Sequence, residues 1–212
     1  DRDLDDAFDA SEIASGTDPA DSLSFPGGPL VVDIPTTSLL LKDGQTAGNP
    51  AKRKLKFTSR TQAQPAANRI VPPVPGSAGD PTLHGAVLRV FNADNSGEQV
   101  TASLPAAQWQ AAGSGWKYVD STPGAPVGRV TVTIDSIKVK AGKTGWSYSL
   151  NEARQRRIAL RLTLGTGTSW CAEAPARATG VPPASGPFDK VDLFKAERNA
   201  PPPGACQSPP AG

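Results

Sequence analysis

The sequence predicts an all-β fold: an antiparallel β-sandwich or open barrel of about ten short strands, with one or two short helices and an extended N-terminal arm. Three observations predict it. Apolar and polar residues alternate at a period of two in many segments, as half-buried strands require. The 21 glycines and 22 prolines are scattered between these segments as turn punctuation. A chain of 212 residues is long enough for one sizeable core.

Four segments carry the clearest alternation and are the strongest strand predictions. In the first of them, Leu55 and Phe57 point to one side of the strand while Lys54 and Lys56 point to the other. The four segments are KRKLKFTSR, GAVLRVFN, RVTVTID and RIALRLTLG. Weaker alternation predicts further strands at residues 30–34, 37–42, 99–104, 116–119, 137–140, 169–173 and 190–196.

Short helices are expected at two places. Ser149 and Glu152 have the spacing of a capping box, which predicts a helix over residues 151–157. A second helix is predicted over residues 105–112, where Trp109 would hold it against the core. Residues 62–81 contain five prolines and no alternation, so they are expected to form a long surface loop. Loops of that length are often functional.

Charge and composition divide the chain into an acidic arm at residues 1–22, a sandwich domain at 23–206 and a short tail at 207–212. Residues 1–21 carry eight acids against one base, Arg2, for a net charge of −7. The rest of the chain carries 21 bases against 12 acids, for a net charge of +9. Such an arm can pair with its own body or with a neighbour's, or remain a solvated tail.

The acidic arm also contains one candidate metal site. Five carboxylates occupy positions 1, 3, 5, 9 and 12 of an EF-hand-like calcium loop: Asp1, Asp3, Asp5, Asp9 and Glu12. Asp6 stands where such a loop needs glycine for its sharp turn, which argues against calcium. The alternative is a plain acidic arm, or an amphipathic turn in which Leu4 and Phe8 share a face. No other cofactor is expected.

The two cysteines, Cys171 and Cys206, lie 35 positions apart among small residues and prolines. Neither belongs to a C-x-x-C unit or lies near the single histidine, so a disulfide is favoured over zinc ligands or two buried thiols. A bridge closing a loop of that size would stabilise the fold by roughly 3 to 4 kcal/mol and implies an oxidising compartment. The sequence also lacks methionine, as a processed exported chain can. A secreted or cell-surface protein is therefore expected.

Catalytic motifs are scarce in this sequence. His84 is the single histidine, and no G-x-S-x-G, H-E-x-x-H or P-loop pattern occurs. The 12 acids outside the arm lie mostly in predicted turns, which does not favour a pair of catalytic carboxylates. The chain is not expected to be an enzyme.

Two further residue classes could contact a ligand. The four tryptophans are expected to pack in the core, the alternative being a sugar-stacking platform. Several basic residues could contact nucleic acid or an anionic polysaccharide, namely Lys52, Arg53, Lys54, Arg154, Arg156 and Arg157. Because no aromatic residues are interleaved with them, they are expected to be solvated first of all, and no nucleic-acid partner is predicted. No apolar run approaches the roughly 18 residues of a membrane-spanning helix, so no membrane span is predicted.

Several segments, taken as a set, resemble a β-rich module of secreted bacterial proteins that has no assigned activity. They are RKLKFTSR, DPTLHGAVLRVFN, SLPAAQW, WKYVD, SYSLNEA, SWCAEA and LFKAERNAPPPGAC. The resemblance covers residues 52–206 and implies export, a β-rich domain and a bridge between Cys171 and Cys206. The first fifty residues fall outside it.

The favoured hypothesis is an extracellular structural protein, a self-assembling homo-oligomeric or polymeric subunit of a surface layer or filament. Its N-terminal strand would be added to the sheet of a neighbouring subunit. Five alternating apolar residues would make that contact: Leu23, Phe25, Leu30, Val32 and Ile34. The alternative is a secreted monomeric binding module for polysaccharide or another cell-surface protein, with its site on loops such as 62–81 or 141–147.

Overall fold

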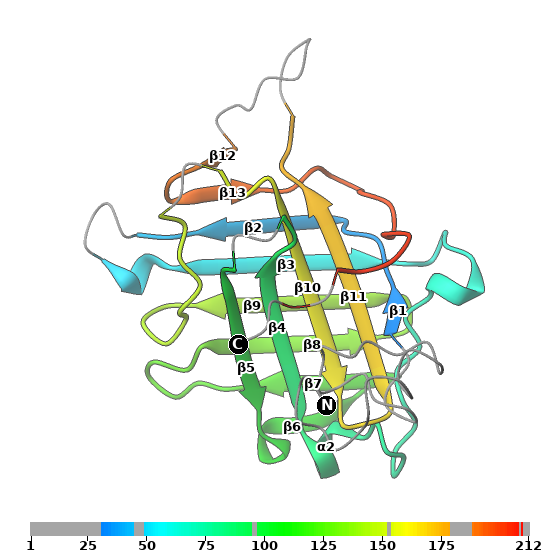
Figure 1. Ribbon diagram of the computed structural model, residues 1–212. Coiled ribbons are helices and arrows are strands. Elements are labelled where there is room, and N and C mark those ends of the chain that lie inside the picture. Colours follow the sequence, from blue (N-terminus) through cyan, green and yellow to red (C-terminus); the bar gives the residue numbers. More distant parts are fainter. Residues whose placement is uncertain are drawn as a thin grey trace, which may run out of the picture.

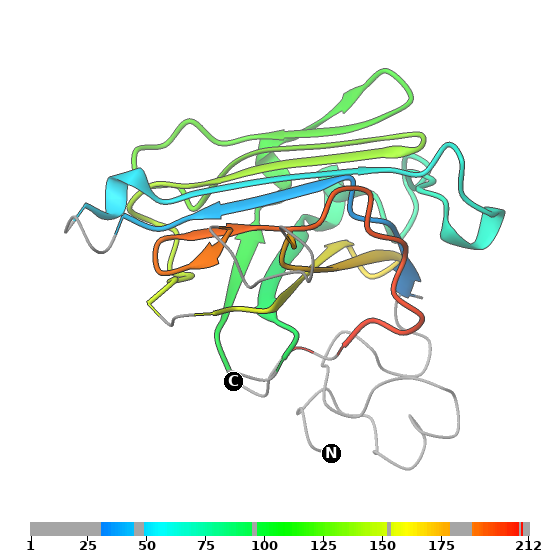
Figure 2. The ribbon, with the colours of Figure 1, turned by 90° about the horizontal axis from the view of Figure 1, so that it is seen from above.

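The computed structural model describes residues 31–44, 49–94, 97–151, 154–178, 188–207 and 209. Two β-sheets pack face to face in a sandwich, and their strands cross at a steep angle (Figure 1). Figure 2 shows the two layers, with the smaller sheet lying along one face of the larger one. The predicted all-β sandwich is confirmed.

The smaller sheet has five strands in the order β1-β11-β10-β4-β5. Among the described strand pairs, β1 with β11 is the parallel one and the others are antiparallel. The strand bounds are β1 Val31–Asp33, β4 Ala86–Asn92, β5 Gln99–Leu104, β10 Arg157–Leu164 and β11 Thr168–Pro175. We refer to it as the five-stranded sheet.

The larger sheet has eight strands in the order β12-β13-β2-β3-β9-β8-β7-β6. All of its pairs are antiparallel. Its strands are β2 Ser38–Lys42, β3 Lys54–Arg60, β6 Trp109–Ala112, β7 Gly115–Val119, β8 Val127–Thr133, β9 Ser136–Gly142, β12 Asp189–Lys190 and β13 Leu193–Lys195. Short helices lie between strands: η2 Pro50–Lys52, η3 Ala66–Asn68, α2 Pro81–His84 and η4 Ala106–Gln108.

The core lies between the two sheets and is built by the alternation seen in the sequence. In the five-stranded sheet, Leu162 lies opposite Leu88 on one neighbouring strand and Trp170 on the other. In the eight-stranded sheet, Phe57 lies opposite Val139 in the same way. All five side chains are at most 2% exposed. Burial of alternate residues on both inner faces stabilises the sandwich.

All of the strongest strand predictions are confirmed, as β3, β4, β8 and β10. The predicted strand at 190–196 is instead a small hairpin, β12 and β13. The predicted helix at 105–112 is wrong in its second half, because a 3-10 turn at Ala106–Gln108 leads into strand β6. Trp109 begins that strand and is buried, as expected.

The predicted helix at 151–157 is wrong where the structure describes it. Asn151 and residues 154–156 are not helical, and Arg156 has a φ of 58°. The Ser149 hydroxyl, expected to cap a helix, donates a hydrogen bond to the Glu98 side chain instead. The Ser149 backbone N–H, which Glu152 would bind in a capping box, donates to the same Glu98 carboxylate.

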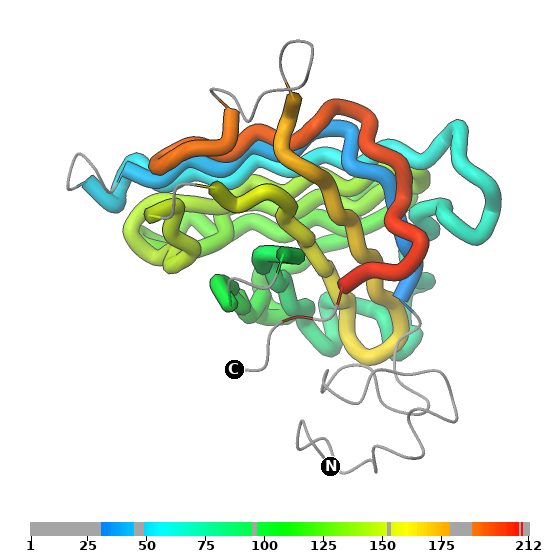
Figure 3. Tube along the Cα trace, turned by 45° about the horizontal axis from the view of Figure 1, so that its top comes forward, coloured from blue at the N-terminus to red at the C-terminus, as the bar shows by residue number. Residues whose placement is uncertain are grey.

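The outer face of the five-stranded sheet is largely buried over β10 and β11, and we call this part the closed face; Thr101 and Ser103, which point outward from β5, are exposed. A disulfide joins Cys171 of β11 to Cys206, with a Cα–Cα distance of 6.1 Å. Cys206 packs against Phe91, Ala93 and Ala159, the small apolar cluster on that outer face. The C-terminal segment around Cys206 therefore lies across the sheet and is fixed there covalently (Figure 3). None of the described helices is long and apolar enough to cross a membrane.

Candidate anion-binding face

The outer face of the eight-stranded sheet carries most of the candidate ligand-binding side chains. In β3, Leu55 and Phe57 point into the core, so Lys54 and Lys56 point outward and are exposed. In β9, Ile137 and Val139 are buried, so Lys138 and Lys140 are exposed in the same way. Alternation along each strand thus sends a lysine to every second position of one surface.

Strand pairing then places these cations side by side. Lys56 lies directly opposite Lys140, and Lys140 lies opposite Arg129. Lys42 lies opposite Lys54 in the pair β2–β3. The outward cations of this sheet, which we call the basic face, are Lys42, Lys54, Lys56, Arg60, Lys117, Arg129, Lys138, Lys140, Lys190 and Lys195.

Acidic side chains are not interleaved with the basic face. The strands of the sheet contain one acid, Asp189, which is 8% exposed and accepts hydrogen bonds from the Gln155 and Arg156 backbone N–H groups. Ion pairs between described residues join other cations: Arg53 with Asp43, Arg69 with Asp135, and Arg157 with Glu173. None of these three ion pairs uses a cation of the basic face.

The electrostatic consequence is visible at Lys54. The charge of Lys56 is the largest cause that lowers the pKa of the Lys54 ammonium, and the charges of Lys42 and Lys140 add to it. Like charges directly opposite each other across a strand pair destabilise a sheet. A bound anion would remove this repulsion, so the arrangement favours anion binding.

Among the described aromatic side chains, Phe188 is half-buried and the others are buried. The exposed large apolar side chains in the described part of the chain are aliphatic: Val71, Val74, Leu83, Val119, Ile134 and Val191. All four tryptophans are at most 6% exposed, which confirms their predicted place in the core. A sugar-stacking platform of tryptophans is therefore not formed. Ligand recognition on this surface has to come from charge and hydrogen bonds.

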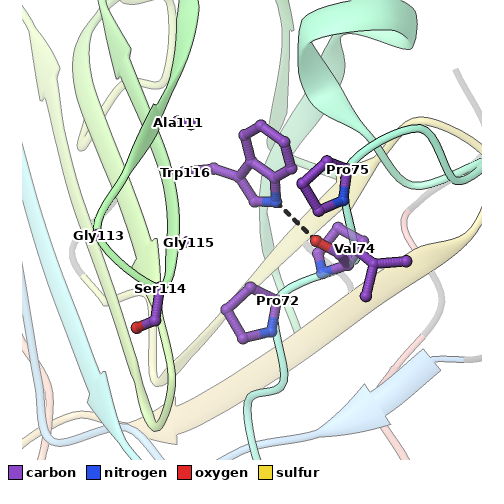
Figure 4. A pocket seen from close by; sticks show the side chains of 9 residues that line it. Pro72, Val74, Pro75, Ala111, Gly113, Ser114, Gly115 and Trp116 are labelled. Carbon is purple, nitrogen blue, oxygen red and sulfur yellow. Dashed lines mark hydrogen bonds between the residues drawn. The ribbon is translucent and has the colours of Figure 1, made fainter.

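The predicted loop at 62–81 lies against the turn between β6 and β7, where it lines a pocket of about 250 Å³. Figure 4 shows Pro72 and Pro75 of this loop beside the Trp116 indole, whereas the Val74 side chain points away from it. The indole N–H of Trp116 donates a hydrogen bond to the Pro73 carbonyl at 3.0 Å, so this donor is already used. The pocket offers a ligand little besides apolar contact and the Ser114 hydroxyl, and it is the weaker candidate.

The loop at 141–147 lines a smaller pocket of about 150 Å³ with Asp120 at its wall. The Asp120 carboxylate accepts a hydrogen bond from the Thr122 backbone N–H, and bonds from Thr122 are the main cause that lowers its pKa. Asp120 is thus a turn-forming residue. Trp146 of the same loop is 1% exposed and takes no part in the surface.

The residues predicted for self-association are only partly described. Leu23, Phe25 and Leu30 lie outside the described residues. Val32 belongs to β1, which pairs with β11 of the same chain, and the Ile34 backbone N–H donates to the Cys171 carbonyl at 2.8 Å. The Ile34 side chain is 1% exposed. Both residues are therefore engaged within their own domain, and self-assembly through this segment stays a prediction.

The five carboxylates predicted as calcium ligands, Asp1, Asp3, Asp5, Asp9 and Glu12, also lie outside the described residues. Among the residues that are described, no cluster of three or more His, Cys, Asp or Glu side chains could hold a metal ion. The disulfide between Cys171 and Cys206 is present as predicted. His84 is exposed at the end of α2.

Of the basic residues singled out in the sequence, one belongs to the basic face, Lys54. Arg53 is held by Asp43 at 3.0 Å, and Arg157 by Glu173 at 2.7 Å. Sequence reasoning missed Lys138 and Lys140, although the alternating segment SIKVKAG contains the signal. The missing information was that β9 pairs with β3, which brings two lysine-bearing strands together.

Comparison with protein-family models, curated proteins and solved structures finds no match to this chain. The resemblance described from the sequence segments therefore stays a prediction. The function has to be argued from the site itself.

Proposed function

We propose that this protein is a secreted binding module whose ligand is an anionic polysaccharide held on the basic face. The observation that carries the proposal is the row of like charges across adjacent strands, Lys56 opposite Lys140 and Lys140 opposite Arg129, with no acid between them. Such a surface destabilises the free protein, and an anionic partner offsets that cost.

The size of the face suits a polymer. Its cations extend from Lys190 on β12 to Lys117 on β7, which are the two ends of a seven-strand span. At about 4.8 Å between neighbouring strands, this span is about 29 Å wide. A single small anion would contact a fraction of it, whereas a chain of several charged sugars would contact it throughout.

Two observations favour a polysaccharide over a nucleic acid. Proteins that bind single-stranded nucleic acid stack bases on exposed aromatic side chains, whereas the described aromatic side chains are buried apart from the half-buried Phe188, whose ring is contacted by Arg177 and Lys195. The disulfide between Cys171 and Cys206 suits an oxidising compartment, where polysaccharides are common ligands. The bonded cysteines support secretion in the same way.

The test is a binding titration with dextran sulfate, with uncharged dextran and a random-sequence DNA duplex in parallel. We expect saturable binding to dextran sulfate that weakens as salt is added, because exposed charges are screened. The double variant Lys56→Gln/Lys140→Gln removes two cations from the centre of the face. It is expected to weaken binding by at least about tenfold, which corresponds to about 1.4 kcal/mol.

A matched control is the double variant Lys52→Gln/Lys143→Gln. It lowers the net charge by the same amount, and both residues are exposed and lie outside the strands. The control should bind dextran sulfate almost as wild type does. An equal loss in both double variants would mean that net charge alone attracts the polymer and would contradict the proposed site. Tighter binding to the DNA duplex than to dextran sulfate would contradict the polysaccharide proposal and would indicate a nucleic acid as the ligand.

A further inference from the structure

A pocket of about 280 Å³ lies on the basic face at the C-terminal end of β13. Four cationic side chains line it, two arginines and two lysines: Lys56, Arg177, Lys195 and Arg198. Leu40 and Ser38 of β2 are also part of its wall. The pocket therefore combines a dense positive charge with a partly apolar surface.

Two separate sets of backbone contacts assemble this charge. In the sheet, Lys195 of β13 lies opposite Leu40 of β2, and Leu40 lies opposite Lys56 of β3. The two lysines thus flank Leu40 on the basic face. At the edge, the chain leaving β11 returns to the end of β13, where the Arg177 backbone N–H donates to the Lys195 carbonyl at 2.8 Å. Segments far apart in the sequence are fixed around one cavity.

One aromatic ring contacts two of these cations. The Arg177 guanidinium carbon lies 5.2 Å from the centre of the Phe188 ring, and the Lys195 ammonium lies 4.9 Å from it. Cation–π attraction orients both groups but leaves their mutual repulsion unrelieved. An anion in the adjoining pocket would stabilise both.

The described acid nearest in sequence to these cations, Glu197, is already used by the backbone. One of its carboxylate oxygens accepts from the Arg198 N–H at 3.2 Å and the other accepts from the Ala178 N–H at 3.4 Å. Glu197 is not part of the pocket lining. The pocket thus presents four cations with no carboxylate in its wall.

We propose that this pocket is a subsite for a tetrahedral oxyanion, a sulfate or phosphate ester carried by the polymer. The inference rests on the proposed function of the basic face, which it deepens. Arginine presents a planar fork of donors that matches such oxygens in pairs, and lysine adds a point charge. A carboxylate offers two oxygens to the donors of these four side chains, whereas a sulfate or phosphate monoester offers three free oxygens. The ligand is therefore predicted to be sulfated or phosphorylated rather than merely carboxylated.

The test compares two polymers on one set of variants: dextran sulfate and polygalacturonate, which carries carboxylates. The pocket variant is Arg177→Ala/Arg198→Ala. Its control, Arg129→Ala/Lys138→Ala, removes an equal charge from the basic face on β8 and β9. We expect the pocket variant to lose about tenfold in affinity for dextran sulfate and about twofold or less for polygalacturonate, while the control loses similar amounts for both.

An amide NMR titration of the wild-type protein with inorganic sulfate, inorganic phosphate and acetate adds an independent measurement. Sulfate or phosphate should shift the signals of Leu40, Arg177 and Lys195 in a saturable way, and acetate should not. Preference for sulfate over phosphate, or the reverse, identifies the ester. Unchanged thermal unfolding of the pocket variant verifies that its fold is retained.

The outcomes separate the two proposals. If wild type binds neither polymer, the proposed function is overturned. If it binds both polymers but the pocket and control variants lose affinity alike for each, the subsite alone is overturned. Acetate shifting the pocket signals as strongly as sulfate would also overturn the subsite.

Discussion

The outer faces of the two sheets have opposite characters. On the five-stranded sheet, outward residues such as Phe91, Arg161 and Thr163 are at most 4% exposed. On the eight-stranded sheet, outward residues such as Lys56 and Lys140 are exposed. The five-stranded sheet is therefore largely covered on both faces at β10 and β11, whereas Thr101 and Ser103 of β5 are exposed. The outer face of the eight-stranded sheet is a free surface.

The difference shows where this chain can meet a partner. The segment around Cys206 packs on one face of the five-stranded sheet and is bonded to it, so this face serves stability. The basic face has like charges in register, so its composition lowers stability. Exposed side chains that lower the stability of the fold are better explained by a role in ligand binding than by a role in folding.

The largest predicted loss of stability follows from removing the disulfide of the closed face. The double variant Cys171→Ser/Cys206→Ser removes the crosslink across 35 positions and should lower the free energy of unfolding by about 4 kcal/mol. Urea denaturation of the variant and of the oxidised wild type measures the difference. Affinity for dextran sulfate at a temperature where the variant is folded should not change. An unaltered urea midpoint would show that the closed face does not depend on its crosslink.

A smaller loss is expected at the edge of the closed face. Glu173 is 7% exposed and accepts hydrogen bonds from Arg157 at 2.7 Å and from the Gln207 N–H at 3.4 Å. Glu173→Ala should lower the free energy of unfolding by about 1 to 2 kcal/mol, because two donors lose their acceptor while Arg157 is exposed enough to be rehydrated. Glu173→Gln keeps one acceptor and should lose less. A loss in the Gln variant equal to that in the Ala variant would contradict this account.

On the basic face, removing a charged side chain should raise the free energy of unfolding rather than lower it. Lys56→Gln removes a charge opposite Lys140 and should raise the free energy of unfolding by about 0.3 to 0.5 kcal/mol at low salt. High salt should abolish the gain, because the wild-type repulsion is then screened. Thermal unfolding at two salt concentrations measures both values. A stabilisation that persists at high salt would mean that charge repulsion is not its cause.

The smallest effect concerns the titration of one group on each face. The pKa of Asp33, which lies on β1 and faces the closed side, is raised mainly by burial. The charge of Glu173 also raises this pKa, whereas a hydrogen bond from the Cys206 N–H lowers it. For Lys54 the charge of Lys56 lowers the pKa. A raised acid pKa means that the fold loses stability as Asp33 ionises with rising pH, from its ordinary value of 3.8 through its raised pKa. A lowered base pKa means that the fold gains stability as pH rises from the lowered pKa towards 10.5.

Side-chain NMR titration can measure both groups directly. Added salt should return the pKa of Lys54 towards 10.5, because repulsion between exposed charges is screened. The pKa of Asp33 should respond less, because burial is its main cause. Equal salt responses of the two groups would remove the distinction between the faces.

The elements of this fold that depend on local pattern could be predicted from the sequence. Alternation in KLKFTSR or RIALRLTL places every second residue in the core, and no distant contact is needed to see it. The bridge between Cys171 and Cys206 followed from there being two cysteines without a metal motif. These inferences concern a strand's own residues, so they carried through to the structure.

The features that could not be predicted depend on contacts between residues that are distant in the sequence. The helix expected after Ser149 is absent where described because Glu98, from the β4–β5 connection, takes the serine's hydroxyl and backbone N–H. The basic face could not be seen for the same reason. Each lysine-bearing strand looks like an ordinary solvated strand by itself, and the charge density arises from the pairing of β3 with β9 and β9 with β8.

The three-residue strand β1 has a further consequence. It pairs with Ser169, Trp170 and Cys171 on the outer edge of β11, whose backbone groups would otherwise be open to pairing with another chain. A truncation that removes residues up to 36 would therefore delete this protecting edge strand. It would also remove the Ile34 side chain from the core. Truncated variants should therefore begin before Val31. A shorter chain would leave the β11 edge unpaired, and two molecules could then associate by pairing strands at that edge.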